Sequence, residues 1–367
     1  MPRYPYGGQA LLEGVLMRGR DAIAVAVRHP DGSIVWKAEP LDSLLHRSRF
    51  ARAPFFRGLV VLYETLVIGT RWLMRSGTIA AAGEGVEMGR GAIAATLAFT
   101  VALAVGLFVL LPLFLAQVTT RATVGADQSL LQHLFEGLIR VAIFIGYLLL
   151  VSRSSEIRRV FQYHGAEHMT IHALEREEPL TIERIRRHPT AHPRCGTEFL
   201  VVFVVVSILV FSLLAGQDLL ISIAGRIVLI PVIASVSYEL LRFGARHRQN
   251  RLVRWIFMPG IWLQLITTKE PDDDMIEVAV ASMQEALRAN GEEAPAGSLD
   301  PERRPLPADG VAATGQGGPS TPEPTPEVAP LPSSLPLGAV GEERDGRREA
   351  RVEEPSAALA RGDAPER

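Results

Sequence analysis

Long runs of apolar residues constrain the fold of this 367-residue chain more than any other feature. A helix needs ~20 mostly apolar residues to cross the hydrocarbon core of a bilayer. Four runs approach or exceed that length and hold few charges, at residues 92–118, 134–152, 199–215 and 219–241. The runs predict a mainly α, polytopic membrane protein with four transmembrane helices, surrounded by a lipid bilayer.

Arginines are distributed unevenly around these runs. Residues 153–198 carry eight arginines and residues 242–254 carry five, whereas the segment between the first two runs holds only Arg121. Cytosolic loops of membrane proteins are enriched in Lys and Arg. The distribution predicts a multi-pass protein of the cell membrane with both termini in the cytosol.

Two further elements are expected before the first apolar run. Residues 22–28 and 33–38 are short β-type runs that flank Asp31-Gly32, and this dipeptide supplies the positive φ that a hairpin needs. Residues 55–75 are apolar but are interrupted by charges, which are costly in the middle of a bilayer. We therefore expect a small β-unit followed by an amphipathic helix at the membrane interface.

The chain after the last run is predicted in three parts. Residues 252–267 are too short to cross a bilayer and contain Pro259-Gly260 as a break, which favours an interfacial position. Residues 272–289 have apolar side chains at helical spacing, and Asn290-Gly291 is a typical stop signal for a helix. The remaining sequence has no aromatic residue and predicts a disordered tail.

These predictions divide the chain into seven regions. They are the N-terminal cytosolic region with the hairpin (1–53), the interfacial helix and its linker (54–91), the first transmembrane helix pair (92–152), a cytosolic His-rich loop (153–198), the second transmembrane helix pair (199–241), an interfacial segment with a cytosolic amphipathic helix (242–290) and the disordered tail (291–367). The His-rich loop contains most of the residues on which a functional prediction depends.

Composition limits the partners and the chemistry. The net charge is −2, and no basic patch of the nucleic-acid-binding kind is present, so we expect no nucleic acid as a partner. The sequence indicates no particular protein partner. Cys195 is the single cysteine, so an internal disulfide is impossible and its thiol is a ligand, a nucleophile or a packing group.

The His-rich loop contains three histidines at intervals of four residues, His164, His168 and His172. On a helix their rings project from one face and can converge on a single ion. Within them, His164-x-x-Glu167-His168 has the residue order of inverted zincins, in which two histidines hold zinc and the glutamate handles the proton. The pattern predicts a divalent metal, zinc, bound by the histidines, with Glu167 as the catalytic proton acceptor.

A third protein ligand is expected, because two imidazoles fill only two of the four positions around zinc. A second cluster, His188, His192 and Cys195, follows in the same loop and immediately precedes the third apolar run. We favour His192 or Cys195 as the third ligand, since the run holds this cluster at the membrane face. The remaining candidates are His172, Glu175 and Glu239.

Alternatives to a metal site remain open. Cys195 is a candidate nucleophile with His192 as its base, although no orienting third group is identifiable. The histidines are otherwise solvated loop residues or helix caps. Glu13 lies in a segment bracketed by glycines, which indicate close backbone approach, and its carboxylate is either exposed or turned inward toward a partner.

Four segments of the chain, taken in order, resemble a known family. They are G-G-Q-A-L-L-E-G-V-L-M-R-G at 7–19, Y-H-G-A-E-H-M-T-I-H at 163–172, H-P-R-C-G-T at 192–197 and T-T-K-E-P-D-D-D-M-I-E-V-A at 267–279. Together they resemble the YqhQ family of uncharacterised bacterial membrane proteins, over residues 7–287. The resemblance implies a predicted metal-dependent enzyme of the bacterial cell membrane, and it implies no substrate.

Two function hypotheses follow. In the first, the cytosolic membrane face carries a metal-dependent hydrolase in which Glu167 activates a water molecule. In the second, the protein is a non-catalytic membrane scaffold or regulator, and the same ligands hold a structural metal. A catalytic site keeps one exchangeable position, whereas a structural site is closed by four protein ligands. An ion carrier is disfavoured because acidic residues are scarce inside the apolar runs.

Overall fold

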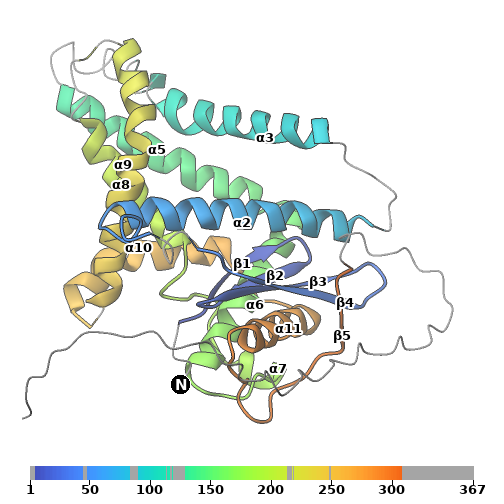
Figure 1. Cartoon of the computed structure of the whole chain (residues 1–367). Coiled ribbons are helices and arrows are strands. Elements are labelled where there is room, and N and C mark those ends of the chain that lie inside the picture. The colour runs from blue at the N-terminus through green and yellow to red at the C-terminus, as the bar shows by residue number, and fades with distance from the viewer. Residues whose placement is uncertain are drawn as a thin grey trace, which may run out of the picture. The chain divides into compact units, whose positions relative to one another are not determined.

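The computed structural model describes residues 5–43, 48–82, 90–112, 114–115, 118, 129–212, 217, 219–247 and 249–307. Its strands are β1 (Gly7–Leu11), β2 (Gly14–Arg18), β3 (Ala22–Arg28), β4 (Ile34–Pro40) and β5 (Arg303–Pro305). Its helices are α2 (Phe56–Ala80), α3 (Arg90–Val105), the π-helical turn η1 (Gly106–Leu110), α5 (Ser129–Val151), α6 (Ser155–Glu175), α7 (Ile182–Ile185), α8 (Thr197–Ser212), α9 (Leu219–Arg246), α10 (Arg251–Thr267) and α11 (Asp273–Ala289). The described part of the chain is mainly helical with one small sheet (Figure 1).

The sheet is an antiparallel meander from β1 to β4, and β5 lies parallel beside β4. The predicted hairpin of β3 and β4 is confirmed, with Arg28 opposite Ile34. Asp31 and Gly32 lie in its turn, where Gly32 adopts a φ of 87°. The Asp31-Gly32 dipeptide was sufficient to predict this hairpin because the turn depends on local backbone conformation.

Helices cover both faces of the sheet. Strand side chains alternate between the faces, so Val15 and Met17 join α6 and α11 in one core. Leu16 and Val25 point the other way and join α2 in a second core. Figure 1 shows α2 and α11 on opposite sides of the strands. Because the histidine motif lies in α6, it is positioned by the packing of α6 against this face of the sheet.

The helix α2 has two apolar sides with different surroundings. Trp72 and Ile79 are buried against the sheet. Tyr63 and Leu66 are 61% and 65% exposed. The helix expected at a membrane interface thus uses one side to complete the core, and its placement in an interface stays a prediction.

The prediction of four transmembrane helices is wrong. Within the described residues, only the helix Leu220–Arg246 is long and apolar enough on its own to cross a membrane. The 16 described residues of α8 extend ~24 Å, less than the ~30 Å of a hydrocarbon core. α3 also has 16 residues and passes into η1.

The described part of α5 passes the same test only together with α6, and these two helices are bent by 99°. The physical reason for the error is that an apolar run in the sequence need not form one straight helix. Among the described residues, α3 and α8 are too short for a bilayer, and the chain bends sharply where α5 ends. The sidedness predicted for the two termini stays a prediction.

The end of α11 agrees with the sequence. The helix stops at Asn290, and Gly291 has a φ of 72°. The N–H of Glu292 then donates to the carbonyl of Leu287 at 2.9 Å, which closes the last turn. α11 is not a surface helix, however, because most of its residues are buried beneath the sheet.

Two other C-terminal predictions are corrected. Pro259 does not break α10, which continues through it and is held where Gly260 packs closely on Glu198. Residues 291–307, predicted as the start of a disordered tail, contain β5. There the Nε atom of Arg303 lies 2.6 Å from a carboxylate oxygen of Glu285, in a buried ion pair. The rest of the predicted tail, 308–367, lies outside the described residues.

Two buried arginines lie among the apolar helices. The Cζ atoms of Arg140 and Arg226 lie 5.2 and 5.3 Å from the ring centroid of Phe211 in α8. A cation over an aromatic ring gains electrostatic stabilisation in an apolar setting. These contacts give both arginines a structural role in holding α5 and α9 against α8.

Candidate metal centre

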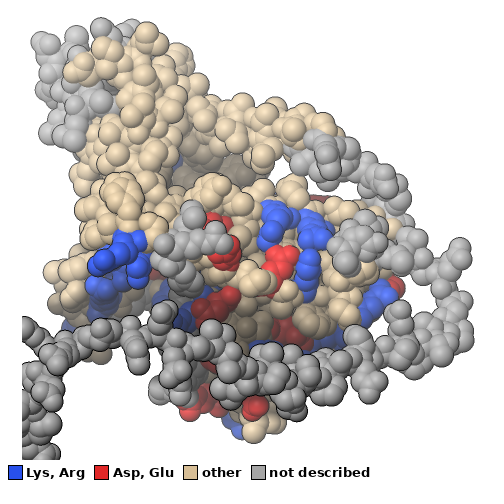
Figure 2. Space-filling model, viewed as in Figure 1, with Lys and Arg blue, Asp and Glu red and all other residues tan. Residues whose placement is uncertain are grey.

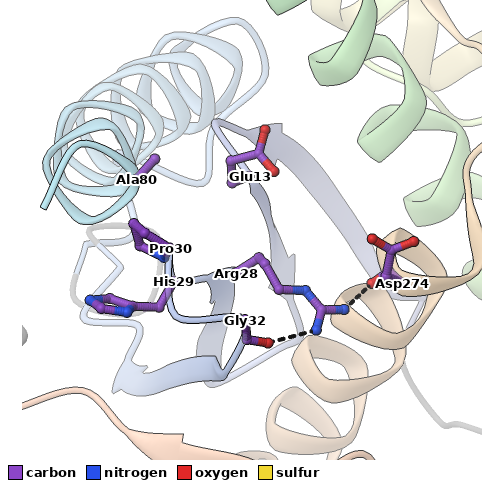
Figure 3. Close-up of a pocket in the computed structure, with 7 residues that line it drawn as sticks. All are labelled: Glu13, Arg28, His29, Pro30, Gly32, Ala80 and Asp274. Carbon is purple, nitrogen blue, oxygen red and sulfur yellow. Dashed lines mark hydrogen bonds between the residues drawn. The ribbon is translucent and has the colours of Figure 1, made fainter. Parts of the chain in front are cut away.

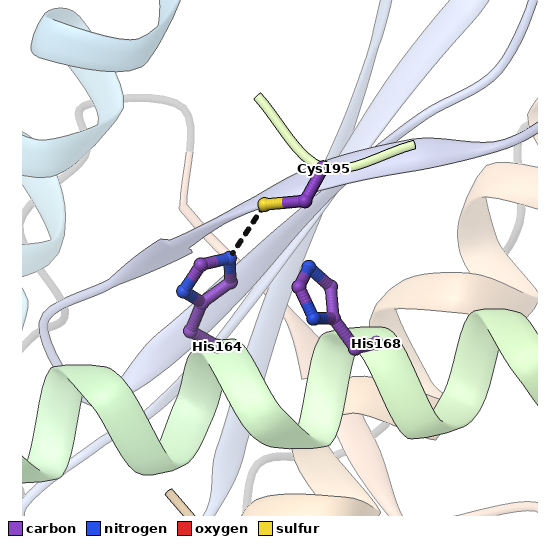
Figure 4. Close-up of side chains that lie close together, drawn as sticks. All are labelled: His164, His168 and Cys195. Atoms are coloured by element: carbon purple, nitrogen blue, oxygen red, sulfur yellow. Dashed lines mark hydrogen bonds between the residues drawn. The ribbon is translucent and has the colours of Figure 1, made fainter. Parts of the chain in front are cut away.

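The helix α6 carries the motif and presents it in two directions. Intervals of four residues place His164 and His168 on the same side of the helix, and the figure shows both rings turned toward Cys195 (Figure 4). Glu167 lies on the neighbouring side, where α6 contacts β1. The histidine side is covered by the segment that connects α7 to α8.

The first cluster consists of His164, His168 and Cys195. One potential ligand atom from each residue lies within 4.8 Å of the others. The Nε2 atom of His164 is 3.3 Å from the Sγ atom of Cys195. The Nε2 atom of His168 is buried and has no hydrogen-bond partner among the described residues. Two imidazole nitrogens and a sulfur therefore converge on one point.

Backbone carbonyls set the orientation of both rings. The Nδ1 atom of His164 lies 2.8 Å from the carbonyl oxygen of Thr267, and that of His168 lies 2.6 Å from the carbonyl oxygen of Thr190. An imidazole that donates its Nδ1–H to a carbonyl carries its lone pair on Nε2. Metal-binding histidines are usually held in this way by a second partner.

The protonation of the cluster also suits a metal. Burial lowers the pKa of His168 to about 2, so its ring is neutral at physiological pH. Burial raises the pKa of Cys195, and hydrogen bonds donated to its sulfur by the hydroxyl and the N–H of Thr197 act in the opposite direction. Imidazole nitrogen and cysteine sulfur are the preferred ligands of zinc. The residues fit a zinc ion that displaces the thiol proton on binding.

Glu167 is buried beside this cluster, with 4% of its surface exposed. Burial raises the pKa of its carboxyl group to about 8, and the nearby His164 acts in the opposite direction. The N–H of Gly8 donates a hydrogen bond to the carboxyl group. Its Oε2 atom lacks a hydrogen-bond partner within the described part of the chain. Glu167 is therefore held at one oxygen and available at the other.

The glycines in the motifs explain how the segments approach so closely. A Cβ atom on Gly8 would lie 2.4 Å from the carbonyl oxygen of Leu16 and 3.0 Å from the Glu167 carboxyl group. A Cβ atom on Gly165 would lie 2.0 Å from the carbonyl oxygen of Lys269. The close approach indicated by the glycines of the first motif is present at Gly8, but its partner was not predictable from local sequence.

The second cluster consists of His172, Glu175 and His192, again with one potential ligand atom each within 4.8 Å of the others. The Nε2 atom of His172 lies 3.0 Å from the carbonyl oxygen of Ala191. The Nε2 atom of His192 lies 3.4 Å from a carboxylate oxygen of Glu175, which is also paired with Arg194. The structure thus divides the predicted ligands of one site into two groups.

The other candidate residues lie in ion pairs away from the first cluster. Both carboxylate oxygens of Glu13, in the turn between β1 and β2, accept hydrogen bonds from Arg159 at 2.6 Å. Glu239 forms an ion pair with Arg57, which joins α9 to α2. His188 contacts Arg176 and lies 3.4 Å from a carboxylate oxygen of Glu178. These contacts give the residues structural partners.

The comparisons with known proteins agree with the sequence motifs. A family model described as "Protein of unknown function (DUF1385)" matches residues 53–289. The chain belongs to this family. The "Uncharacterized protein YqhQ" of Bacillus subtilis (strain 168) is 33% identical over 298 residues, which cover 77% of this chain and 92% of that protein. No solved structure matches the chain.

Membership of the DUF1385 family confirms the resemblance to YqhQ and leaves activity open. The thiol geometry in this family member differs from the predicted Cys195–His192 pair. His164 lies at the sulfur, whereas the ring nitrogens of His192 face Glu175 and the N–H of Arg194. A nucleophile with His192 as its base does not match this arrangement.

One supporting residue had no signal in the sequence. The fully buried side chain of Gln264 in α10 accepts a hydrogen bond from the N–H of His192 at 2.8 Å and donates one to its carbonyl at 3.0 Å. It thereby fixes the backbone between the two clusters. A single glutamine in an apolar helix is not recognisable as a clamp without the tertiary structure.

A second candidate cavity lies elsewhere. It has a volume of about 420 Å³ and is lined by Glu13, Arg28, His29 and Asp274, among others (Figure 3). Arg28 crosses its floor and donates to the carbonyls of Gly32 and Asp274 at 3.0 and 2.6 Å. Glu13 and Arg28 in its lining already form ion pairs with Arg159 and Glu277, so the convergent histidine and cysteine atoms are the better candidate site.

Proposed function

We propose that this protein is a metal-dependent hydrolase whose ion is held by His164, His168 and Cys195 and whose proton acceptor is Glu167. One observation carries the proposal. Both histidines direct Nε2 toward the same point as the Cys195 sulfur because a backbone carbonyl binds each Nδ1–H. When bound there, a divalent ion such as zinc supplies a Lewis acid that polarises the bond to be hydrolysed.

Glu167 supplies the proton transfer in this proposal. A general base is most effective when its pKa lies near the working pH, and burial raises the pKa of Glu167 to about 8. The Gly8 N–H holds the carboxyl group, and Oε2 accepts a proton from the attacking water. The same oxygen then returns the proton to the leaving group.

Three protein ligands distinguish a catalytic zinc site from a structural one, because zinc takes four and the fourth position stays open. The second cluster does not supply a fourth ligand to this site, since His192 and Glu175 face each other rather than Cys195. The substrate class is left to experiment, because the proposed roles of the three ligands and of Glu167 are common to ester, amide and phosphoester hydrolysis.

We also propose that the chain is attached to the bacterial cell membrane through α9. Leu220 and Val228 on this helix are 78% and 72% exposed, which is costly in water. Figure 2 shows almost no charged side chains over α3 and the upper part of α9, whereas basic side chains gather near the lower end of α9. Fractionation of cells measures this directly, and recovery of the full-length chain in the soluble fraction would refute it.

A non-catalytic scaffold with a structural metal is the second candidate, and burial favours it. His168 is 1% exposed and Cys195 is 8% exposed, so a substrate has little direct access in this conformation. The cavity described above lies against Glu13 and Arg28 instead. In the scaffold the ion joins α6 to the start of α8, and Glu167 has no proton to accept.

Three substitutions separate these functions. We expect His164→Ala and His168→Ala to lose bound zinc, measured by metal analysis of the purified protein. Glu167→Gln should keep the zinc and lose function in a complementation assay, because the amide keeps the shape and cannot accept a proton. Full function in Glu167→Gln would refute the proposed hydrolase and leave the scaffold as the remaining function. Zinc retained by both histidine variants would remove the metal site itself.

A further inference from the structure

We propose that His172, Glu175 and His192 form a second divalent-cation site, separate from the first, and that Arg194 closes it. The cluster lies one helical turn further along α6. Its three potential ligand atoms come from α6 and from the segment that follows α7, and they lie within 4.8 Å of one another. That spacing allows all three to reach one ion with little movement.

The two sites are distinct rather than halves of one two-metal centre. His168 and His172 are four residues apart, so their positions differ by ~6 Å along the helix axis. Co-catalytic ions lie closer together, ~3.5–4 Å apart, and share ligands. No residue belongs to both clusters. Each ion therefore binds to its own set of ligands.

The ligand chemistry of the second cluster differs from that of the first. Two imidazoles and a carboxylate suit first-row divalent cations, and they lack the soft thiolate that selects zinc at Cys195. The carbonyl of Ala191 accepts a hydrogen bond from Nε2 of His172, which leaves the lone pair on Nδ1. The segment that orients His168 through Thr190 thus also orients His172.

Arg194 interacts with two of the three proposed ligands and therefore competes with a cation for them. Its guanidinium forms an ion pair with Glu175, the only carboxylate of the cluster. Its backbone N–H lies 3.3 Å from Nδ1 of His192, so this atom is the acceptor and Nε2 carries the proton. For Nε2 to bind an ion, the proton must move to Nδ1, where the Arg194 N–H now points. Displacement of Arg194 releases both ligands together.

The Arg194 guanidinium and an incoming divalent metal ion therefore compete for the same ligands. Arg194 is 42% exposed, so its side chain can leave Glu175 for solvent. An ion that enters takes the carboxylate and the His192 ring in one step. Occupancy of the second site then depends on the metal concentration, while the buried first site stays filled at lower concentrations.

Titration of the full-length protein with Co²⁺ tests the proposal. Cobalt bound by a thiolate shows sulfur-to-metal charge-transfer absorption, whereas cobalt bound by nitrogen and oxygen does not. We expect one tight ion with this absorption and a second, weaker ion without it. In Arg194→Ala the second ion should bind about tenfold more tightly, since the competing charge is gone. The matched control is Arg187→Ala, an exposed arginine that pairs with Glu183, and it should titrate like the wild type.

His172→Ala and Glu175→Gln should each abolish the second binding step and keep the charge-transfer absorption. Cys195→Ser should lose the absorption and keep the second step, so failure of the first site is distinguishable from failure of the second. An unchanged second affinity in Arg194→Ala would overturn the role of Arg194. Two ions bound with unchanged affinity in both His172→Ala and Glu175→Gln would overturn the site.

Discussion

The backbone N–H of Gly8 donates a hydrogen bond to the carboxyl group of Glu167. Gly8 belongs to the N-terminal strand β1, and Glu167 belongs to the central motif in α6. Two motifs that are far apart in the sequence therefore meet at the proposed proton acceptor. The bond opposes the effect of burial and stabilises the ionised carboxylate.

Gly8→Ala tests this contact. The new Cβ atom would lie 2.4 Å from the carbonyl oxygen of Leu16 in β2 and 3.0 Å from the Glu167 carboxyl group, so β1 must shift relative to both β2 and α6. We expect a loss of about 1–3 kcal/mol in the free energy of unfolding, as for other overpacked sites. Urea denaturation measures the loss. Gly7→Ala is the matched control because a Cβ atom there has no neighbour within 4 Å. Equal stability of the two variants would contradict the contact.

Gly165→Ala should weaken zinc binding without touching a ligand. Its Cβ atom would lie 2.0 Å from the carbonyl oxygen of Lys269 and would push residues 267–269 away from α6. The hydrogen bond from His164 to the carbonyl of Thr267 would then lengthen. Loss of such a second partner typically lowers metal affinity ~10-fold or more. Competition with a zinc chelator measures the affinity.

The control for this variant is Gly146→Ala in α5, where a Cβ atom meets nothing within 4 Å. Alanine is a better helix former than glycine, so this control should be neutral or slightly stabilising. Wild-type zinc affinity in Gly165→Ala would show that the carbonyl of Thr267 does not determine the orientation of His164.

Glu13 should contribute a stability that disappears in acid. Hydrogen bonds from Arg159 lower the pKa of Glu13 below its ordinary value of 4.5. A lowered pKa in the folded state stabilises the fold above the unfolded value, and the effect is lost as pH falls through the folded value. We expect Glu13→Gln to cost about 1 kcal/mol near neutral pH.

That cost should shrink toward zero as the pH falls below the folded pKa of Glu13, because the wild-type carboxylate is then protonated. Urea denaturation across this range gives the comparison. Glu183→Gln removes an exposed pair with Arg187 and should change stability little at any pH. A cost in Glu13→Gln that does not vary with pH would rule out the ion pair as its cause.

Several features were determined by the sequence alone, and they are local. Asp31-Gly32 specified the hairpin and Asn290-Gly291 specified the end of α11, since each depends on a backbone conformation that glycine permits. The interval of four residues placed His164 and His168 on one side of a helix. Four short motifs identified the family.

Only the tertiary structure decided which distant groups meet. His164 and Cys195 are separated by 31 positions, and the path of the segment after α7 placed Cys195 rather than His192 at the first cluster. The same reason underlies the error about transmembrane helices, since hydropathy records how apolar a run is and not where a helix bends or ends. Local conformation follows from neighbouring residues, whereas long-range contacts depend on how all the elements pack together.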